Sequence, residues 1–356
     1  MSRALDAETA ASLRSGDPLA AYQAISSVLG SSAPSDGLLE IEILGPSHFI
    51  EGGQQHFLRD GRAVGFSKLA LVQAFMVARQ RLQDHLSGVV PLPDDEVLAA
   101  TAVILLFDPE YLTAANVRKR LVQAMISGSG AAAAARARLE SEKRFVDSLL
   151  TSRLHRHTKS PTLWSHRRWL LGVFISLDLP VDVLQDIKDV VFVAGERHPR
   201  NYYAWCHARF LMGLDKPIHR AEVLEAVQAW CFQHHTDTSG WSFLYFLLDT
   251  ETDSSKATGC STFAAVLALV SSLRLANESV WVFLRTLAAS RLVGDEQYLE
   301  FLAVQAAVLE TLKTPADQAV LRAAANWCKT YRDNAAHLHS TGDLTPARLM
   351  RRHTPT

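Results

Sequence analysis

Residues 198–211 of this chain are His198-Pro199-Arg200-Asn201-Tyr202-Tyr203-Ala204-Trp205-Cys206-His207-Ala208-Arg209-Phe210-Leu211. Pro199 and Asn201 suit the start of a helix, because proline is tolerated in a first helical turn and asparagine can bond to free backbone donors there. A second stretch upstream has the same pattern, Lys159-Ser160-Pro161-Thr162-Leu163-Trp164-Ser165-His166-Arg167-Arg168-Trp169-Leu170. In both stretches the tryptophan is followed by histidine two residues later and by arginine four residues later. The pattern is therefore an internal repeat.

Four of the seven tryptophans mark this repeat. Trp164, Trp205, Trp241 and Trp281 are separated by 41, 36 and 40 residues, and a weaker copy places Ala115 in the tryptophan position. Each of these five units has the length of one helical hairpin, which cannot bury its apolar face alone and must stack on its neighbours. The sequence predicts an all-α fold, a right-handed α/α superhelix. This fold is a solenoid of about five helical hairpins, similar to a tetratricopeptide array.

Composition and hydrophobic periodicity divide the chain into four predicted segments. Residues 1–37 are expected to be variable or partly disordered, with a short helix over 19–29. Residues 38–94 form an N-terminal arm, extended over 38–44, and a helix over 68–86. Residues 95–310 form the repeat solenoid, and residues 311–356 form a C-terminal helix and tail.

The charge balance and the cysteines exclude several classes of protein. Lys and Arg number 36 against 37 acidic residues, so no basic surface for nucleic acid is expected. The first residues lack the apolar core of a secretory signal, and the longest apolar run, 97–107, is about half of the ~20 residues that cross a bilayer. We therefore expect no transmembrane segment. The four cysteines show no metal or disulfide spacing, which favours a reducing cytoplasm.

The two tryptophan stretches resemble the repeats of protein prenyltransferase alpha subunits. Within that family the chain resembles the branch called protein prenyltransferase alpha subunit repeat-containing protein. The stretches that carry this second resemblance are Asp108-Pro109-Glu110, Ala115-Asn116-Val117-Arg118-Lys119 and Asp237-Thr238-Ser239-Gly240-Trp241. The likeness covers roughly residues 95–290 and continues more weakly back to about residue 38.

The resemblance implies a subunit rather than a complete enzyme. In this family the alpha subunit wraps a separate beta subunit, which carries the catalytic zinc and the isoprenoid pocket. The residues agree with that division, because no cofactor or metal site is indicated in this chain. His155, His157 and His166 lack the spacing of a zinc site and are more simply polar helix faces, and neither a GxxxxGK loop nor a GxSxG motif occurs.

Three residues have roles implied by the resemblance. Lys159, five residues before Trp164, matches a lysine that reaches the isoprenoid diphosphate, where an ammonium would stabilise the charge of the leaving group. Arg200 has the same position in the next unit, and Tyr202 matches a tyrosine near the rim of the active site. A solvated lysine before a helix remains the alternative for Lys159. Thr162 stands where CaaX enzymes carry a glutamine that contacts the substrate's terminal carboxylate, so recognition of a CaaX end is in doubt.

The remaining repeat residues have structural explanations beside functional ones. Trp164, Trp205, Trp241 and Trp281 are expected to fill the core between hairpins. For the basic residues that follow two of these tryptophans, both hydrogen bonding between repeats and contact with a partner remain open. These residues are His166, Arg168, His207 and Arg209.

We therefore predict the alpha-type subunit of a heterodimeric protein prenyltransferase, inactive alone. Its partner is expected to be a zinc-bearing beta subunit, with which it shares a geranylgeranyl or farnesyl diphosphate. The substrate is expected to be a protein with a C-terminal cysteine, and geranylgeranyl is favoured by the branch that the chain resembles. The alternative is a non-catalytic helical-repeat scaffold that binds other proteins. A stand-alone enzyme is disfavoured because no nucleophile or metal set is evident.

Overall fold

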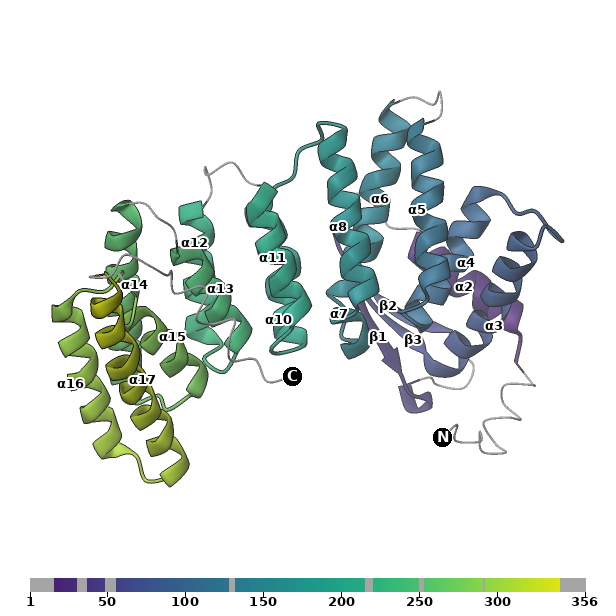
Figure 1. Cartoon of the computed structure of the whole chain (residues 1–356). Helices are drawn as coiled ribbons and strands as arrows, with labels where there is room; N and C mark the ends of the chain where they lie inside the picture. The colour runs from purple at the N-terminus through teal and green to yellow at the C-terminus, as the bar shows by residue number, and fades with distance from the viewer. Residues whose placement is uncertain are drawn as a thin grey trace. The chain divides into compact units, whose positions relative to one another are not determined.

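The computed structural model describes residues 16–30, 37–48, 56–127, 132–214, 220–249, 253–290 and 292–339. The chain forms two compact units, Met1–Gly213 and Leu214–Thr356. Figure 1 shows that both units consist mainly of helices packed side by side, with one small sheet in the first unit. The all-α helical-repeat fold is confirmed. The predicted segment boundaries and the right-handed sense of the superhelix stay predictions.

Three helices begin the first unit. They are α2 (Pro18–Gly30), α3 (Lys68–Leu86) and α4 (Asp94–Phe107), and each packs on the other two. Helix α4 contains the longest apolar run, and most of its side chains from Val97 to Leu106 are buried. The helices expected over 19–29 and 68–86 are both confirmed.

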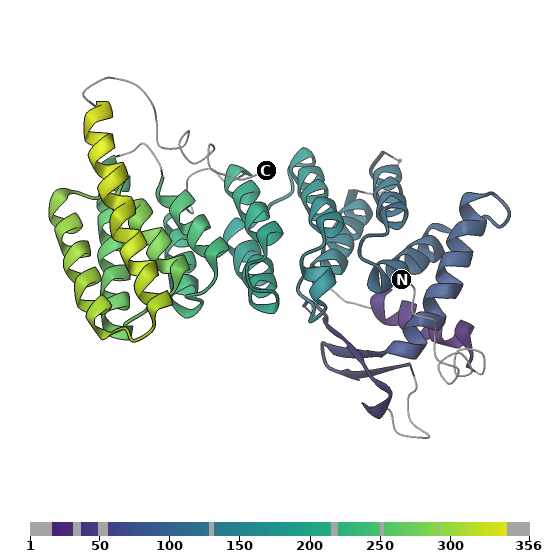
Figure 2. The same cartoon turned by 60° about the horizontal axis from the view of Figure 1, so that its bottom comes forward.

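A three-stranded sheet lies between α2 and α3 in the sequence. Its strands are β1 (Glu40–Leu44), β2 (Phe57–Asp60) and β3 (Ala63–Ser67), and a short 3-10 helix, η2 (Pro46–His48), follows β1. The strand order is β1-β3-β2, with β1 parallel to β3 and β2 antiparallel to it. Figure 2 shows the sheet beside the helices of this unit. The extended segment over 38–44 is confirmed as β1, whereas β2 and β3 were not predicted.

The repeat helices of the first unit follow in pairs. They are α5 (Leu112–Ser127), α6 (Ala132–Leu150), α7 (His155–Thr158), α8 (Pro161–Ser176), α9 (Val183–Asp186), the π-helical segment η3 (Ile187–Phe192), α10 (Val193–Arg197) and α11 (Tyr202–Leu214). Helices α5, α6 and α8 contact one another, and α7 contacts α10. Helices α8 and α11 carry Trp164 and Trp205. The sequence Ser127-Gly128-Ser129-Gly130 predicts a flexible break between two helices, and residues 128–130 lie outside the described residues.

The second unit continues the hairpin pattern. Its helices are α12 (Arg220–Gln233), α13 (Thr238–Leu248), α14 (Asp253–Leu273), α15 (Glu278–Ala288), α16 (Asp295–Thr311) and α17 (Pro315–His339). Helix α13 packs on α12 and α15, α14 packs on α16, and α15 packs on α17. Helices α13 and α15 carry Trp241 and Trp281.

Helix α14 contains one apolar window, Lys256–Leu273, that could cross a membrane by length and composition alone. A third of this window is buried inside the protein, and its buried side chains include Phe263, Val266 and Leu267. A core helix of a soluble protein meets the same criterion. The absence of a transmembrane segment therefore stays an expectation.

The tryptophan helices start in the same way. Ser160, Asn201 and Asp237 each lie four residues before a tryptophan, and each side chain accepts a hydrogen bond from the backbone N–H three residues later. These caps satisfy backbone donors that have no partner inside the helix. Asn201 thus has its expected role, whereas Pro199 lies in the preceding turn instead of the first helical turn.

The carbonyl six residues before the repeat position binds the next hairpin at two places in the first unit. Thr158 O accepts a hydrogen bond from Trp164 Nε1 at 2.8 Å and another from Asn201 Nδ2 of the following hairpin at 2.6 Å. Pro109 O, six residues before Ala115, accepts from Ser160 Oγ at 3.3 Å.

The second unit uses the same carbonyl. His235 O accepts from Trp241 Nε1 at 3.1 Å and from Ser279 Oγ of the next hairpin. Trp281 Nε1 donates to Leu275 O, again six residues earlier, at 2.9 Å. The four tryptophan side chains are at most 4% exposed, so they lie in the core between hairpins as predicted.

Replacing Trp164 or Trp205 by alanine should lower the free energy of unfolding by about 3 to 5 kcal/mol, because each change leaves a cavity between stacked hairpins. Thermal and urea melting of the purified chain measure this loss. Tyr202→Ala is the matched control, since Tyr202 lies on the same helix as Trp205 but is 67% exposed. Equal stability of the tryptophan variants and the control would refute the core assignment.

Candidate functional site

Lys159 lies in the short turn between α7 and α8. Its side chain is exposed, and it makes no ion pair or hydrogen bond with any residue that the structure describes. Its backbone N–H bonds to His157 O, which fixes the end of α7. The predicted position before the α8 cap is therefore observed, and the ammonium is available to a ligand.

Arg200 occupies the equivalent turn before α11. It is exposed and adopts a left-handed backbone conformation with φ of 61°, which is uncommon for a residue with a side chain. The next residue, Asn201, bonds to Thr158 O, and Thr158 directly precedes Lys159. This bond brings the turns that carry Lys159 and Arg200 together.

Two histidines complete the surface around these turns. The Nδ1 atoms of His155 and His198 are 3.3 Å apart, and their rings meet edge to face with centroids 5.5 Å apart. Burial lowers the pKa of His198, and the positive charges of Lys159 and His155 lower it further. We call His155, Lys159, His198 and Arg200 the basic corner.

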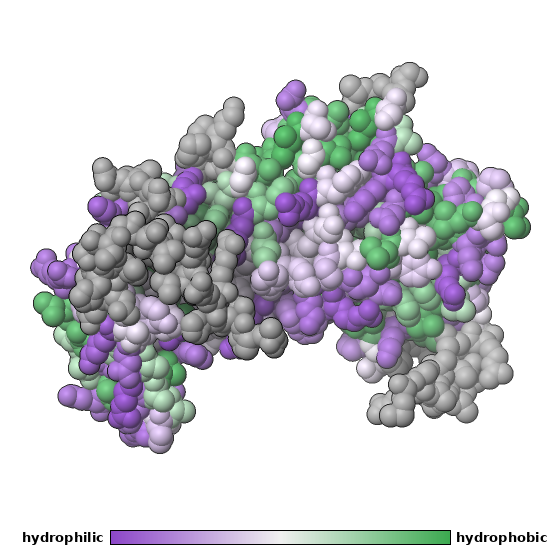
Figure 3. All heavy atoms as spheres, viewed as in Figure 1, coloured by the Kyte–Doolittle hydropathy of each residue, from purple (hydrophilic) through white to green (hydrophobic). Residues whose placement is uncertain are grey.

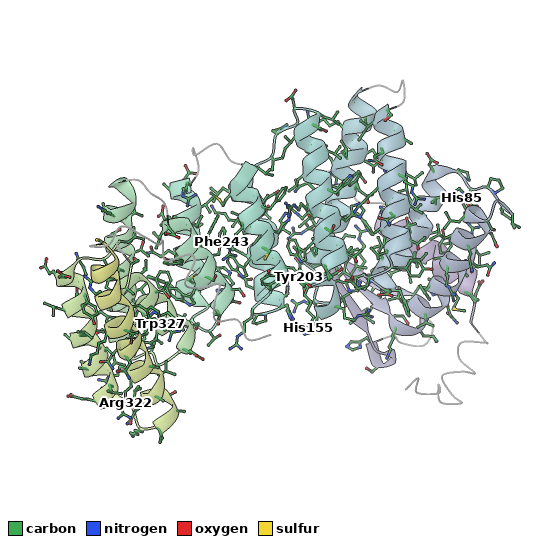
Figure 4. All side chains as sticks on the ribbon, viewed as in Figure 1. His85, His155, Tyr203, Phe243, Arg322 and Trp327 are labelled. Carbon is green, nitrogen blue, oxygen red and sulfur yellow. The ribbon has the colours of Figure 1, made fainter. Side chains whose placement is uncertain are left out.

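Two carboxylates near the basic corner have partners. Arg156 binds Asp108 at 2.9 Å, and Thr162 Oγ1 donates to Glu110 Oε2 at 2.6 Å. Figure 3 shows hydrophilic side chains gathered over the region of α7, and Figure 4 labels His155 there. The Lys159 ammonium has no ion pair with any described residue, so an anion that approaches this turn would meet its positive charge.

His155 was expected on a polar helix face instead of at a zinc site, and His198 was not predicted as a site residue. The 43-residue separation of the two histidines hides their contact in the sequence. One sequence signal could have revealed this contact. Each histidine lies shortly before one of two equivalent turns, since His155 precedes Lys159 and His198 precedes Arg200.

Tyr202 lies at the first turn of α11 and is 67% exposed. Its ring meets that of Tyr203 edge to face at 5.7 Å. A hydrogen bond with Cys206 raises the pKa of the Tyr202 hydroxyl, and the Arg209 guanidinium opposes that shift. Tyr202 is therefore accessible, as its expected place at the rim of a site requires.

Arg168 and Arg209 line the exposed side of their helices. The Arg168 guanidinium lies 4.6 Å from the centroid of the Phe210 ring, a cation–π contact between adjacent hairpins. Arg209 is half buried and donates to Trp205 O at 3.2 Å. Lys119 lies over Trp169 at 5.8 Å in the same relation, one hairpin earlier.

His166 and His207 are buried, which favours a role between repeats over contact with a partner, the two roles left open for them. The His207 ring packs against Trp164 of the preceding hairpin, with centroids 5.1 Å apart. The His166 ring nitrogens have no hydrogen-bond partner, and Nε2 lies 3.4 Å from Glu142 Oε1. Their side chains therefore pack between repeats and cannot contact a partner.

Arg167 was not predicted as a site residue, and it is fully buried. Its guanidinium binds Asp147 at 2.7 Å and Asp186 at 3.0 Å, and Nη1 donates to His207 Nε2 at 2.6 Å. Lys143 binds the same two carboxylates. Burial alone would raise the pKa of Asp147, but the charges of Arg167 and Lys143 outweigh it and hold the pKa below its ordinary value. This network joins α6, α8, α9 and α11.

Arg118 has the same role one hairpin earlier. It binds Glu142 through two contacts of 2.7 Å and donates to Leu98 O and Thr101 Oγ1. Arg118 and Arg167 both lie three residues after the repeat position of the tryptophan. That shared spacing was the signal for a buried cation.

No group of three or more His, Cys, Asp or Glu side chains gathers as metal ligands would within the described ranges. His157, expected on a polar helix face, is buried and donates from Nε2 to Leu105 O and Leu106 O. Burial lowers its pKa to about 4. His157 is therefore a structural donor between hairpins.

The second unit replaces the polar repeat residues by apolar ones. Phe283 packs on Trp241 with centroids 5.0 Å apart, in the same relation as His207 to Trp164. Arg285 is retained and lies over the Trp327 ring at 4.4 Å. The chemistry that could serve a ligand is therefore concentrated in the first unit.

His166→Phe should make the chain more stable in mild acid, because Phe243 and Phe283 already occupy the same repeat position. Burial lowers the pKa of His166 to about 4 in the folded state. In the unfolded state the same side chain binds a proton below pH ~6.5. Stability from neutral His166 is therefore lost as the pH falls from ~6.5 toward 4. The variant should gain about 2 kcal/mol over the parent on going from pH 7 to pH 5.

Urea unfolding at the two pH values measures this gain. His48→Phe is the control, since His48 is exposed and its replacement should not change the pH dependence. A parallel loss of stability in His166→Phe and the parent would show that His166 does not titrate as a buried neutral group.

Two family models match the chain. The protein prenyltransferase alpha subunit repeat matches residues 139–174, which contain most of α6 and nearly all of α8. The ECM9 middle domain matches residues 163–270. Both matches include Trp164 and the buried Arg167.

Curated relatives match about half of the chain. Protein ECM9 of Saccharomyces cerevisiae is 29% identical over 181 residues, which are 51% of this chain and 47% of the yeast protein. Protein prenyltransferase alpha subunit repeat-containing protein 1 of Homo sapiens is 32% identical over 175 residues, 43% of this chain and 40% of the human protein. The protein of the same name from Danio rerio is 29% identical over 182 residues, 44% and 38% of the two chains.

The matched region thus spans less than half the length of these relatives. The tryptophan repeat of this chain and the match to the repeat model agree with each other. Over this part of its length the chain is similar to the protein prenyltransferase alpha subunit repeat family.

Proposed function

We propose that this chain is the alpha-type subunit of a heterodimeric protein prenyltransferase. In this proposal it binds a zinc-bearing beta subunit in the cytoplasm and helps to transfer an isoprenoid from its diphosphate to a protein cysteine. Geranylgeranyl is the lipid that we propose, on the resemblance to the repeat-containing branch of the family. The chain needs no cofactor of its own in this assignment.

The observation that carries the proposal is the exposed ammonium of Lys159, which has no ion pair or hydrogen bond with any described residue and lies beside the turn of Arg200. Departure of diphosphate gathers negative charge on its oxygens, and a cation held at that position stabilises the transition state more than the ground state. A lysine with only a structural role would be stabilised by an ion pair with a carboxylate. The nearby Asp108 carboxylate pairs with Arg156 instead of Lys159. Tyr202 and Arg200 supply an accessible rim on the next hairpin.

Thr162 and Glu110 support a substrate class other than CaaX proteins. Thr162 stands where CaaX enzymes carry a glutamine for the terminal carboxylate, and its hydroxyl already donates to Glu110 at 2.6 Å. A second carboxylate brought to the same place would meet the negative charge of Glu110. We therefore propose that the acceptor cysteine is chosen by other features of the substrate protein.

A non-catalytic scaffold is the second candidate. Its support is the burial of His166, Arg167 and His207, since most of the polar residues in the repeat motif stabilise the stack. The two candidates differ in what they need. A scaffold requires no cation at the basic corner, whereas a transferase subunit loses activity without one.

The purified chain alone, given zinc, geranylgeranyl diphosphate and a cysteine-bearing protein, should show no lipid transfer. Addition of a geranylgeranyltransferase-type beta subunit should produce a complex on size-exclusion chromatography and restore transfer of radiolabelled lipid. Transfer by the chain alone would refute the division of labour. A stable complex without transfer would favour the scaffold.

Lys159→Ala should slow lipid transfer in the assembled complex by about 10 to 100-fold, because the lost charge acts mainly as the carbon–oxygen bond of the diphosphate breaks. Single-turnover rates isolate this step from lipid binding. Lys188→Ala is the matched control, since Lys188 is also exposed and lies on η3. If Lys159→Ala transfers lipid at the rate of the control, Lys159 has no role in catalysis.

A further inference from the structure

Three neighbouring helices of the first unit carry no acidic residue. Helices α5, α8 and α11 contain neither Asp nor Glu, whereas α6 and the run from α9 to α10 contain both. Helix α8 lies between α5 and α11 and has contacts with each (Figure 1). The whole chain has 36 Lys and Arg against 37 acidic residues. Positive charge is therefore gathered on one set of helices, although the total charge is close to zero.

The cations of these helices form two sets that differ by one position in the repeat. Arg118 and Arg167, three residues after the repeat position of the tryptophan, are buried and bind carboxylates of α6 and α9. Lys119, Arg168 and Arg209 follow that position by four residues, so they are turned by about 100° around the helix from the first set. Lys119 and Arg168 make no ion pair with any residue that the structure describes. The second set therefore has room for acidic groups from another molecule.

Aromatic rings hold two cations of the second set in place. Lys119 Nζ lies 5.8 Å from the centroid of the Trp169 ring, and Arg168 Cζ lies 4.6 Å from that of Phe210. In both contacts the ring comes from the next hairpin. A ring fixes the position of a cation without neutralising its charge, and a stacked guanidinium keeps N–H groups at its edge for a carboxylate. We call Lys119, Arg168, Trp169, Arg209 and Phe210 the cationic stripe.

We propose that the cationic stripe is a docking surface for an acidic segment of a partner protein. The occupant follows from charge complementarity, because one cation lies on each of three successive helices that have no carboxylate of their own. Packed helices are about 8–10 Å apart. In the polyproline II conformation every third side chain points the same way, about 9 Å further along. An extended segment with an acidic residue at every third position would therefore place its carboxylates over successive cations.

Nucleic acid fits this surface less well than an acidic protein segment. A DNA strand in a duplex carries one phosphate per ~3.4 Å, so most of its phosphates would meet no cation of the stripe. The net charge of −1 gives the chain no long-range attraction for a polyanion. Neither Lys159 nor a lipid takes part in the contact, so the docking surface is independent of the proposed function.

Fluorescence anisotropy with the isolated full chain tests the docking surface. The probe is a labelled peptide of about 15 residues with glutamate at every third position and proline or alanine elsewhere. A second peptide has glutamine in place of each glutamate. We expect the glutamate peptide to bind at least about 10-fold more tightly than the glutamine peptide and to weaken as salt is added. Equal affinity of the two peptides, or no binding of the glutamate peptide, would overturn the proposal.

Substitutions in the stripe locate the bound peptide. Arg168→Gln and Lys119→Gln should each weaken binding of the glutamate peptide by about 2 to 5-fold, because each removes one ion pair. Lys188→Gln is the matched control, since Lys188 is exposed on η3 and lies outside the stripe. Thermal melting identifies a variant that is unfolded, and the other variant is then compared with the control. Affinity equal to that of the control in a folded stripe variant would overturn the proposal.

A labelled single-stranded DNA of similar length distinguishes the two classes of polyanion. It should bind the chain more weakly than the glutamate peptide at the same salt concentration. Tighter binding of the DNA that is weakened by Arg168→Gln would overturn the assignment to an acidic protein segment. These titrations contain neither beta subunit nor lipid. A complex that transfers no lipid would therefore leave the docking surface intact, and loss of peptide binding would leave the role of Lys159 intact.

Discussion

The backbone carbonyl six residues before the repeat tryptophan is the group on which the rest of the structure depends. Thr158 O accepts bonds from Trp164 of its own hairpin and from Asn201 of the next, and His235 O does the same for Trp241 and Ser279. A carbonyl has two lone pairs, so it can serve both donors at once. The indole is then buried between hairpins, which explains why a residue this large recurs in four of the five hairpins.

Buried charged side chains also constrain how the helices of the first unit pack. Arg118 and Arg167 follow the repeat position by three residues and bind carboxylates on neighbouring helices. Such pairs gain little net stability over apolar packing, but they strongly disfavour any arrangement that leaves one charge unpaired. We infer that they fix the register of the hairpins in this unit. Phe283 packs at a position of the second unit that corresponds to His207 in the first, which requires no such pairing.

The same bonds that hold the hairpins also assemble the basic corner. Asn201 ties its turn to Thr158, so Lys159 and Arg200 approach each other although neither contributes to the core. His155 and His198 meet through the contact between α7 and α10. Any function of the basic corner would therefore depend on the packing of the hairpins. A change that loosens this packing would also separate the turns of Lys159 and Arg200.

The sequence by itself determined the period of the repeat, the cap before each tryptophan and the exposed turn that holds Lys159, because these follow from local helix chemistry and spacing. Only the tertiary structure decided which of His166, Arg167 and Arg168 faces inward, since consecutive positions on a helix differ in direction but the side that meets a neighbour is set by stacking. The tertiary structure also decided the partners of the buried charges. The His155–His198 pair and the strands β2 and β3 depend on contacts between segments whose local patterns are weak, so spacing alone did not reveal them.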